Sequence, residues 1–206
     1  SGPIAVLLPK STEIIISNLA ILYSGNFYTN LDFKAPQERL IKLLSNLSPK
    51  LIITNDVGNA LLKKLDIDIE TLVDISDSMT LKESFDVDRI NDVQKASIDV
   101  SPACIINTSG STGVPKSVVL NHKSTIDFID WCLDTFEFRS DDVIGSLSPF
   151  YFDIYTLELF VSLAKGCAIS IINEHKAAFP VELVKSLNDT KITFIFWVPT
   201  VMVNIA

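Results

Sequence analysis

The segment from Asn107 to Lys116 has the residue types of a loop that binds an anion. It reads Asn-Thr-Ser-Gly-Ser-Thr-Gly-Val-Pro-Lys, with two glycines, four hydroxyl side chains and a terminal lysine. Glycine lets a backbone approach a ligand closely, and successive backbone N–H groups in such a loop form a concave anion site. Hydroxyl groups add hydrogen-bond donors, and lysine adds a charge suited to phosphate. The residues predicted to bind phosphate are Thr108, Ser109, Gly110, Ser111, Thr112, Gly113 and Lys116.

The order of these residues differs from the Walker motif. That motif has Gly-Lys-Ser/Thr in direct succession at the start of a helix. Here Pro115 separates Gly113 from Lys116, and β-branched residues follow. The loop is therefore predicted to connect two strands. An ordinary polar turn is the alternative, because clusters of Ser, Gly and Pro often form turns.

A second candidate residue is Asp153, which follows the aromatic cluster Phe150, Tyr151 and Phe152 and precedes an apolar, helix-like run. An aspartate at this place can cap the helix by accepting N–H bonds from its first turn. The aromatic side chains can equally belong to the core. The residues alone favour these structural roles over ligand binding.

The histidines and cysteines show no catalytic or metal-binding pattern. His122 precedes a predicted helix and His175 lies in a polar turn, and neither has a triad partner nearby in the sequence. Cys104, Cys132 and Cys167 lie in apolar surroundings without metal-like spacing. They are predicted to be buried thiols of a protein in a reducing compartment, the cytoplasm, and no metal site is predicted within the chain.

The elements that must position these residues follow a β-α-β-α-β order twice. In each copy a glycine, Gly25 or Gly166, ends the first helix and lies 26 positions before the third strand. Proline at residue 36 or 180 opens the second helix. The predicted strands are residues 4–8, 27–31, 51–53 and 72–75 in the first half, and 143–147, 167–172 and 192–196 in the second.

This repetition predicts an α/β fold made of two similar βαβαβ units. Their mainly parallel sheets are covered by helices, as in a three-layer α/β sandwich. The predicted first subdomain is residues 1–100, with an acidic, loop-rich connector at about 76–100. The second, residues 101–206, carries the anion loop. Ligands are expected outside the carboxyl ends of the parallel strands.

Composition excludes some classes of partner. The chain has 206 residues, is 48% hydrophobic and carries a net charge of −8. Nonspecific nucleic-acid binding needs a basic surface, so it is not expected. No membrane span is predicted, because residues 192–203, the longest apolar stretch, are too short to cross a bilayer and contain Pro199. No signal peptide is predicted either, because the start of the chain lacks a cationic region before its apolar run.

Three segments resemble the adenylate-forming enzymes, the ANL superfamily. Thr108 to Lys116 resembles their phosphate-binding signature, in the version of the amino-acid adenylation domains of nonribosomal peptide synthetases. Ser117 stands where the family usually has glycine. Phe152 to Glu158 resembles the second core motif, Phe-Asp-x-Ser-x-x-Glu, with Tyr155 in place of serine. Residues 19–40 resemble an early structural stretch of the family.

The resemblance implies a reaction of an amino acid with ATP to give an aminoacyl-adenylate and pyrophosphate. The aminoacyl group then passes to the thiol of a phosphopantetheinyl carrier. By this resemblance, Lys116 and the loop hold the β- and γ-phosphates, with Lys116 catalytic. Asp153 pairs with the substrate's α-ammonium group, while Ile154 and Leu157 line the pocket for its side chain.

The chain is identified by the same resemblance as an N-terminal fragment of an adenylation domain. The ligands of Mg²⁺, the adenine contacts and the catalytic C-terminal part are expected outside it, so the fragment alone is expected to be inactive. A D-alanine–carrier protein ligase or an acyl- or aryl-CoA ligase is the alternative within the superfamily. Outside the superfamily's chemistry, a non-catalytic scaffold that binds a nucleotide or a partner domain is also compatible with the sequence.

Overall fold

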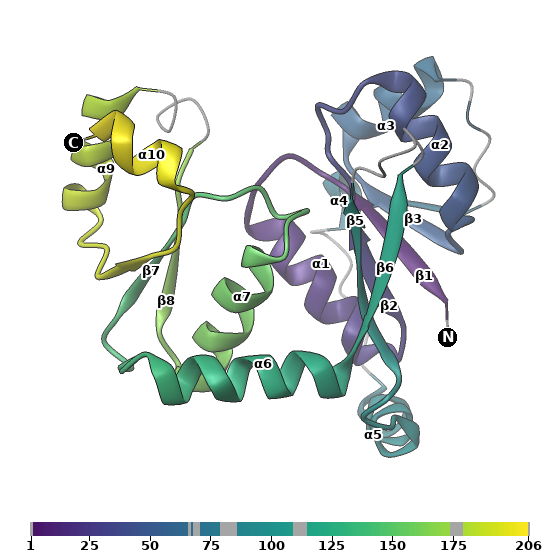
Figure 1. Ribbon diagram of the computed structural model, residues 1–206. Coiled ribbons are helices and arrows are strands. Elements are labelled where there is room, and N and C mark those ends of the chain that lie inside the picture. The colour runs from purple at the N-terminus through teal and green to yellow at the C-terminus, as the bar shows by residue number, and fades with distance from the viewer. Residues whose placement is uncertain are drawn as a thin grey trace. The chain divides into compact units, whose positions relative to one another are not determined.

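Figure 1 shows the computed structural model, which describes residues 2–65, 67, 71–78, 86–108, 115–173 and 179–205. The chain divides into two units, residues 1–125 and 126–206. The elements of the first unit are β1 (Pro3–Leu7), α1 (Thr12–Tyr23), β2 (Phe27–Asn30), α2 (Gln37–Leu47), β3 (Leu51–Thr54), α3 (Asp56–Lys64), β4 (Leu72–Asp74), α4 (Ile75–Ser78), α5 (Val87–Ala96), β5 (Pro102–Thr108) and β6 (Lys116–Asn121). Helix α6 (His122–Thr135) crosses the division, and the second unit continues with β7 (Val143–Ser146), α7 (Ile154–Lys165), β8 (Ala168–Ile171), α9 (Pro180–Asp189), β9 (Phe194–Ile195) and α10 (Pro199–Ile205).

The first unit is built on a sheet in the order β4-β3-β1-β2-β5-β6. All its described pairs are parallel except β5 with β6, which are antiparallel. Ala5 and Leu7 of β1 pack in one core cluster with Leu40 of α2 and Leu62 of α3. Because strand side chains alternate between faces, the buried Val6 points to the other face, where Figure 1 places α1. The predicted arrangement of helix layers on both sides of a sheet is confirmed here.

The second unit contains a parallel sheet in the order β8-β7-β9. Its core cluster joins Ile129 and Cys132 of α6, Ile144 of β7, and Leu157 and Val161 of α7. Rings of Phe136, Phe138 and Phe194 extend this cluster, with centroids of Phe138 and Phe194 4.7 Å apart. Apolar residues on α6 and α7 therefore cover the short sheet.

The two βαβαβ units share the same strand order, because the first strand of each lies between the second and the third. Matching backbone hydrogen bonds flank each central strand: Lys50 N–H to Pro3 O and Thr193 N–H to Val143 O, both at 3.0 Å, then Leu31 N–H to Val6 O at 2.9 Å and Ile172 N–H to Ser146 O at 3.0 Å. Gly25 and Gly166 follow the first helix of each unit with φ of +71° and +72°, a region that favours glycine. The predicted repetition is confirmed.

The division between the units differs from the boundary predicted at residue 100. Strand β5 pairs with β2 at Tyr28 and Cys104, and β6 continues the same sheet. The hairpin that flanks the anion loop therefore completes the first sheet and belongs to the first unit. The predicted acidic connector also contains a helix, α5, whose N-terminus is capped by Asp86 accepting from Arg89 N–H at 3.0 Å. Residues 79–85 of the connector lie outside the described residues.

The three cysteines are free and buried. Burial raises the pKa of the Cys104 thiol to about 11 and also raises the pKa of Cys132. Since the thiolate is the reactive form, about one Cys104 thiol in a thousand is ionised at pH 8. We expect iodoacetamide at pH 8 to leave Cys104 unmodified in the folded chain and to label all three cysteines after denaturation, as read by mass spectrometry. Labelling of native Cys104 at the rate of the denatured chain would contradict this.

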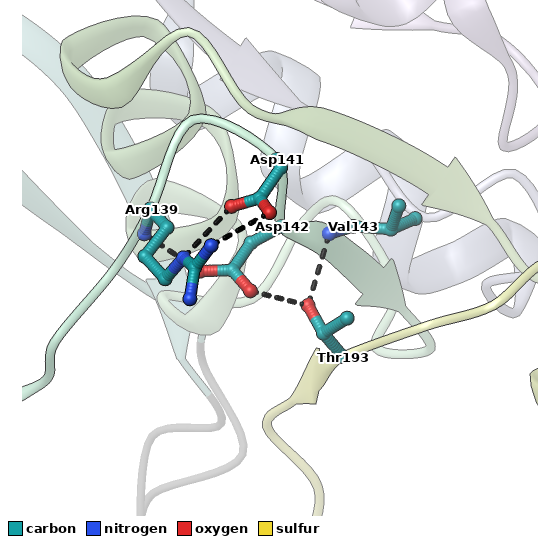
Figure 2. A network of polar contacts seen from close by, with 5 residues as sticks. All are labelled: Arg139, Asp141, Asp142, Val143 and Thr193. Carbon is teal, nitrogen blue, oxygen red and sulfur yellow. Dashed lines mark hydrogen bonds and ion pairs between the residues drawn. The ribbon is translucent and has the colours of Figure 1, made fainter.

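A polar network fixes the start of β7 against the residue before β9 (Figure 2). Asp142 Oδ2 accepts from Arg139 N–H at 2.7 Å, and Oδ1 accepts from the Thr193 hydroxyl at 2.7 Å. The Thr193 oxygen in turn accepts from Val143 N–H at 3.0 Å. These bonds, first that from Arg139 N–H and then that from Thr193, lower the pKa of Asp142. The network joins the amino ends of two parallel strands, opposite the edge where ligands are expected.

We expect Asp142 to make the stability of the chain pH-dependent. Because its pKa is lower in the folded state than the ordinary 3.8, its contribution is complete above that value and is lost as pH falls through the folded pKa. Asp142→Asn should therefore lower Tm at pH 7 and have a smaller effect at pH 3. Thermal unfolding at both pH values checks this, with Asp141→Asn as control, since Asp141 forms an exposed ion pair with Arg139 at 2.9 Å. An equal loss of Tm at both pH values for Asp142→Asn would contradict it.

Candidate functional site

The anion loop lies between β5 and β6, the two strands of a hairpin in the first unit. Thr108 ends β5 and lies opposite Lys116, which begins β6. The Thr108 hydroxyl donates to Lys116 O at 3.4 Å, and both residues are exposed. The predicted connection of two strands is thus seen in the structure. Five of the predicted loop residues lie outside the described residues: Ser109, Gly110, Ser111, Thr112 and Gly113.

The end of the hairpin that carries Thr108 and Lys116 lies at the edge of the sheet where ligands are expected. Strand β5 is parallel to β2, and β2 is parallel to β1, so Thr108, Asn30 and Leu7 mark the carboxyl ends of three parallel strands. Ligands of open α/β sheets bind outside these ends. Lys116 begins β6 at this edge and is exposed.

Asp153 lies at the N-terminus of α7 in the second unit. Its Oδ1 accepts from Ile154 N–H at 2.9 Å, and its side chain is exposed. The predicted capping contact is therefore present, and it holds the carboxylate at the start of the helix. Solvent exposure leaves the group accessible to a cationic ligand. Asp153 follows β7 by seven positions, past the carboxyl end of that parallel strand.

The two other predicted pocket residues differ in burial. Ile154 is half-buried, next to Asp153, while Leu157 is 3% exposed and packs in the core cluster of the second unit. The aromatic residues near Asp153 also differ in burial. Phe150 stacks on Tyr155 with centroids 4.3 Å apart, and both are buried, whereas Phe152 is exposed. Tyr155, which stands in place of a serine in the resembling motif, is therefore a core residue.

A buried polar pair beneath Asp153 was not foreseen from the sequence. Ser146 ends β7 and Glu158 lies in the second turn of α7, and both have 0% exposure. The Ser146 hydroxyl donates to Glu158 Oε2 at 2.5 Å. This bond joins the strand to the helix that begins at Asp153. The signal in the sequence is a single glutamate inside an apolar helical run, where a charged residue is seldom buried unless it has a partner.

His122 has a structural place in the first unit. It begins α6, and its backbone N–H donates to Ser101 O at 3.0 Å. His122 is one of the residues that line an open groove of about 240 Å³, with residues of α1 and α5 that include Tyr23 and Gln94. His175 lies outside the described residues.

Within the described ranges, no three or more His, Cys, Asp or Glu side chains gather in a way that could hold a metal ion. In the same part of the chain, none of the helices has the length and apolar character needed to cross a membrane.

Comparisons with known proteins find one enzyme family along nearly the whole chain. The family described as AMP-binding enzyme matches residues 1–206. Gramicidin S synthase 2 of Brevibacillus brevis is 33% identical over 199 residues, which are 96% of this chain and 4% of that protein. The D-alanine–D-alanyl carrier protein ligase of Bacillus cytotoxicus is 28% identical over 194 residues, 93% of this chain and 37% of the ligase.

A solved structure gives the same picture of the fold. A four-domain nonribosomal peptide synthetase bound to AMP and glycine superposes with a TM-score of 0.84 at 21% identity, covering 100% of this chain and 14% of that one. The chain thus spans well under two thirds of the length of each of these relatives.

Proposed function

The chain belongs to the AMP-binding enzyme family, and on that premise we propose that its full-length protein activates an amino acid with ATP. An oxygen of the amino-acid carboxylate forms a bond to the α-phosphorus, and the bond from that phosphorus to the bridging oxygen of pyrophosphate breaks. The products are aminoacyl-AMP and pyrophosphate. The observation that carries the proposal is the hairpin that presents Lys116 opposite Thr108 at the carboxyl edge of a parallel sheet.

In this proposal the hairpin binds the leaving group. The Lys116 ammonium and the Thr108 hydroxyl, with the loop residues between them, hold the β- and γ-phosphates. Charge accumulates on pyrophosphate as its bond to the α-phosphorus breaks, so a fixed cation at this place lowers the barrier. The same contacts orient the α-phosphate toward the attacking carboxylate. Lys116 is the catalytic residue of the chain in this scheme.

Asp153 binds the amine in the same proposal. Its carboxylate is exposed, and Ile154 N–H fixes one of its oxygens at 2.9 Å. An α-ammonium group meets the carboxylate as an ion pair, which gains strength when the bound substrate excludes water. Ile154 and Leu157 line the pocket for the side chain. Acids that lack an amine leave Asp153 without a partner, so the proposal favours amino acids over fatty or aryl acids.

The second half of the reaction needs a carrier. The family relative from Bacillus cytotoxicus is named for a D-alanyl carrier protein, which supports a phosphopantetheinyl carrier thiol as the acceptor of the aminoacyl group. Mg²⁺ with ligands outside this chain completes the proposed set of cofactors. The cytoplasm is the proposed compartment, supported by three free, buried thiols.

A D-alanine–carrier protein ligase is the second candidate, favoured by the 28% identity to a ligase of that name. It uses the same site residues, because D-alanine also carries an amine. An acyl- or aryl-CoA ligase would not need the carboxylate of Asp153, and a non-catalytic scaffold would bind ATP without turning it over.

ATP–pyrophosphate exchange by the full-length protein distinguishes these functions. The panel contains the proteinogenic amino acids, D-alanine, fatty acids and aryl acids. Exchange with one or a few amino acids is expected, and exchange with D-alanine alone identifies the carrier-protein ligase. Exchange with only fatty or aryl acids contradicts the amino-acid assignment, and tight ATP binding without any exchange favours the scaffold. The 206-residue chain by itself is expected to show no exchange.

A further inference from the structure

Three polar side chains form a hydrogen-bonded relay across the neighbouring strands β2, β5 and β6, close to the Thr108–Lys116 end of the hairpin. Ser117 of β6 donates from its hydroxyl to Asn107 Oδ1 at 2.8 Å. Asn107 of β5 donates from Nδ2 to Thr29 Oγ1 at 2.8 Å. Thr29 of β2 donates its own hydroxyl to the backbone oxygen of Ile105 at 3.2 Å. The relay thus joins the edge strand of the sheet to a strand in its interior.

Burial increases along the relay. Ser117 is exposed, Asn107 is half-buried and Thr29 has 0% exposure. The buried end is fixed, because the Thr29 hydroxyl both accepts from Asn107 and donates to a backbone oxygen. An asparagine amide offers an acceptor and a donor at once, which lets Asn107 bridge two hydroxyl groups. An exposed side chain on the outer strand is therefore tied to a rigid point in the core.

The relay lies directly beside the residues proposed to contact phosphate. Asn107 pairs with Ser117 in the β5–β6 ladder, and the next pair along the hairpin is Thr108 with Lys116. Strand β6 is the outermost strand of the described sheet, and its first four residues are exposed. In the described sheet, β6 is thus held on one side only, so a cross-strand side-chain bond at its loop end adds a constraint on Lys116.

We propose that Thr29, Asn107 and Ser117 are positioning residues that set the hairpin, and with it Thr108 and Lys116, for the ATP triphosphate. This inference rests on the proposed adenylation function. The relay touches no substrate itself. It acts by holding β5 and β6 in one register and twist at the end that carries Thr108 and Lys116. This matters for catalysis because small displacements of a charged group weaken a pre-organised electrostatic site.

The test compares variants of the full-length protein by ATP–pyrophosphate exchange and by calorimetric ATP binding. Ser117→Ala is expected to lower kcat/KM for ATP about tenfold, near the effect of one lost hydrogen bond, and to leave KM for the amino acid unchanged. Ser117→Thr, which keeps the hydroxyl, should stay within about twofold of the parent protein. Ser24→Ala is the control, because the Ser24 hydroxyl donates to Ile21 O at 2.7 Å within one helix end and joins no strands.

A double-variant cycle separates a relay from unrelated losses of stability. Thr29→Val removes the buried hydroxyl with little change of shape, and Ser117→Ala combined with Thr29→Val should weaken ATP use no more than the stronger single variant. Tm is recorded for each variant, and a lower Tm with unchanged ATP parameters overturns the proposal. So do fully additive losses, or ATP parameters of Ser117→Ala equal to those of the parent.

The outcome for the proposed function is read separately, from the parent protein. If the parent binds ATP without exchange, adenylation is rejected, while the ratio of ATP Kd values between the parent and Ser117→Ala still decides on the relay. If the parent does not bind ATP, both proposals are overturned.

Discussion

Replacing Asp153 with asparagine in the full-length protein is expected to lower kcat/KM for the amino acid by about 100-fold, which corresponds to about 3 kcal/mol. The variant removes the negative charge that pairs with the α-ammonium group. It keeps the side-chain oxygen that accepts from Ile154 N–H, so the start of α7 remains capped. KM for ATP is expected to stay near that of the parent protein. ATP–pyrophosphate exchange with varied amino-acid concentration measures the effect.

Two controls make this result specific to the amine. Asp141→Asn removes another exposed carboxylate of the same unit, and we expect parent-like kinetics from it. The cognate acid without its amino group is expected to be used poorly, and to the same extent, by the parent protein and by Asp153→Asn. Parent-like kinetics of Asp153→Asn with the amino acid would show that Asp153 only caps the helix.

Replacing Glu158 with alanine is expected to destabilise the second unit by about 3 kcal/mol. The change removes the hydrogen bond between Ser146 and Glu158 and opens a cavity between α7 and β7, where both residues have 0% exposure. Glu158→Gln keeps an oxygen that can accept from Ser146, so a much smaller loss is expected. Urea unfolding of the 206-residue chain, followed by circular dichroism, gives the free energy of unfolding for each variant.

Glu137→Ala is the matched control for Glu158→Ala, because Glu137 is an exposed glutamate of the same unit. Its expected effect is below about 0.5 kcal/mol. A similarly small effect of Glu158→Ala would show that the Ser146–Glu158 bond contributes nothing to holding α7 on the strand. In the full-length protein, the predicted loosening of α7 should also raise KM for the amino acid, since Asp153 begins that helix.

Much of the fold was predictable because its signals are local. Apolar runs gave the parallel strands, and Gly25 and Gly166 marked the two helix ends with positive φ. The position of the unit boundary depends instead on β5 pairing with β2, which brings Asn107 next to Thr29, 78 residues away. Nothing in the local pattern encodes that pairing. Helix α5 was missed because it has no buried residue among those described and its polar sequence resembles a loop.

The candidate site shows the same contrast between local and distant signals. Lys116 was identified from the residue types of its own loop, and Asp153 from the resemblance of residues 152–158 to a family motif. The partner of Ser117 was not, although this serine was recognised as differing from the glycine usual in the family. The hydrogen bond to Asn107 depends on the register of the hairpin, which is visible only in the structure.

The central position of each unit's first strand has a consequence for synthesis on the ribosome. Ile4 of β1 pairs with Leu51, which is synthesised 47 positions later. Ile144 of β7 pairs with Phe194, which is synthesised 50 positions later. Until then the central strand of each unit has one open side. Nascent chains that end between α9 and β9 therefore expose an unpaired edge of β7, which is where a chaperone or a second nascent chain finds backbone groups to bind.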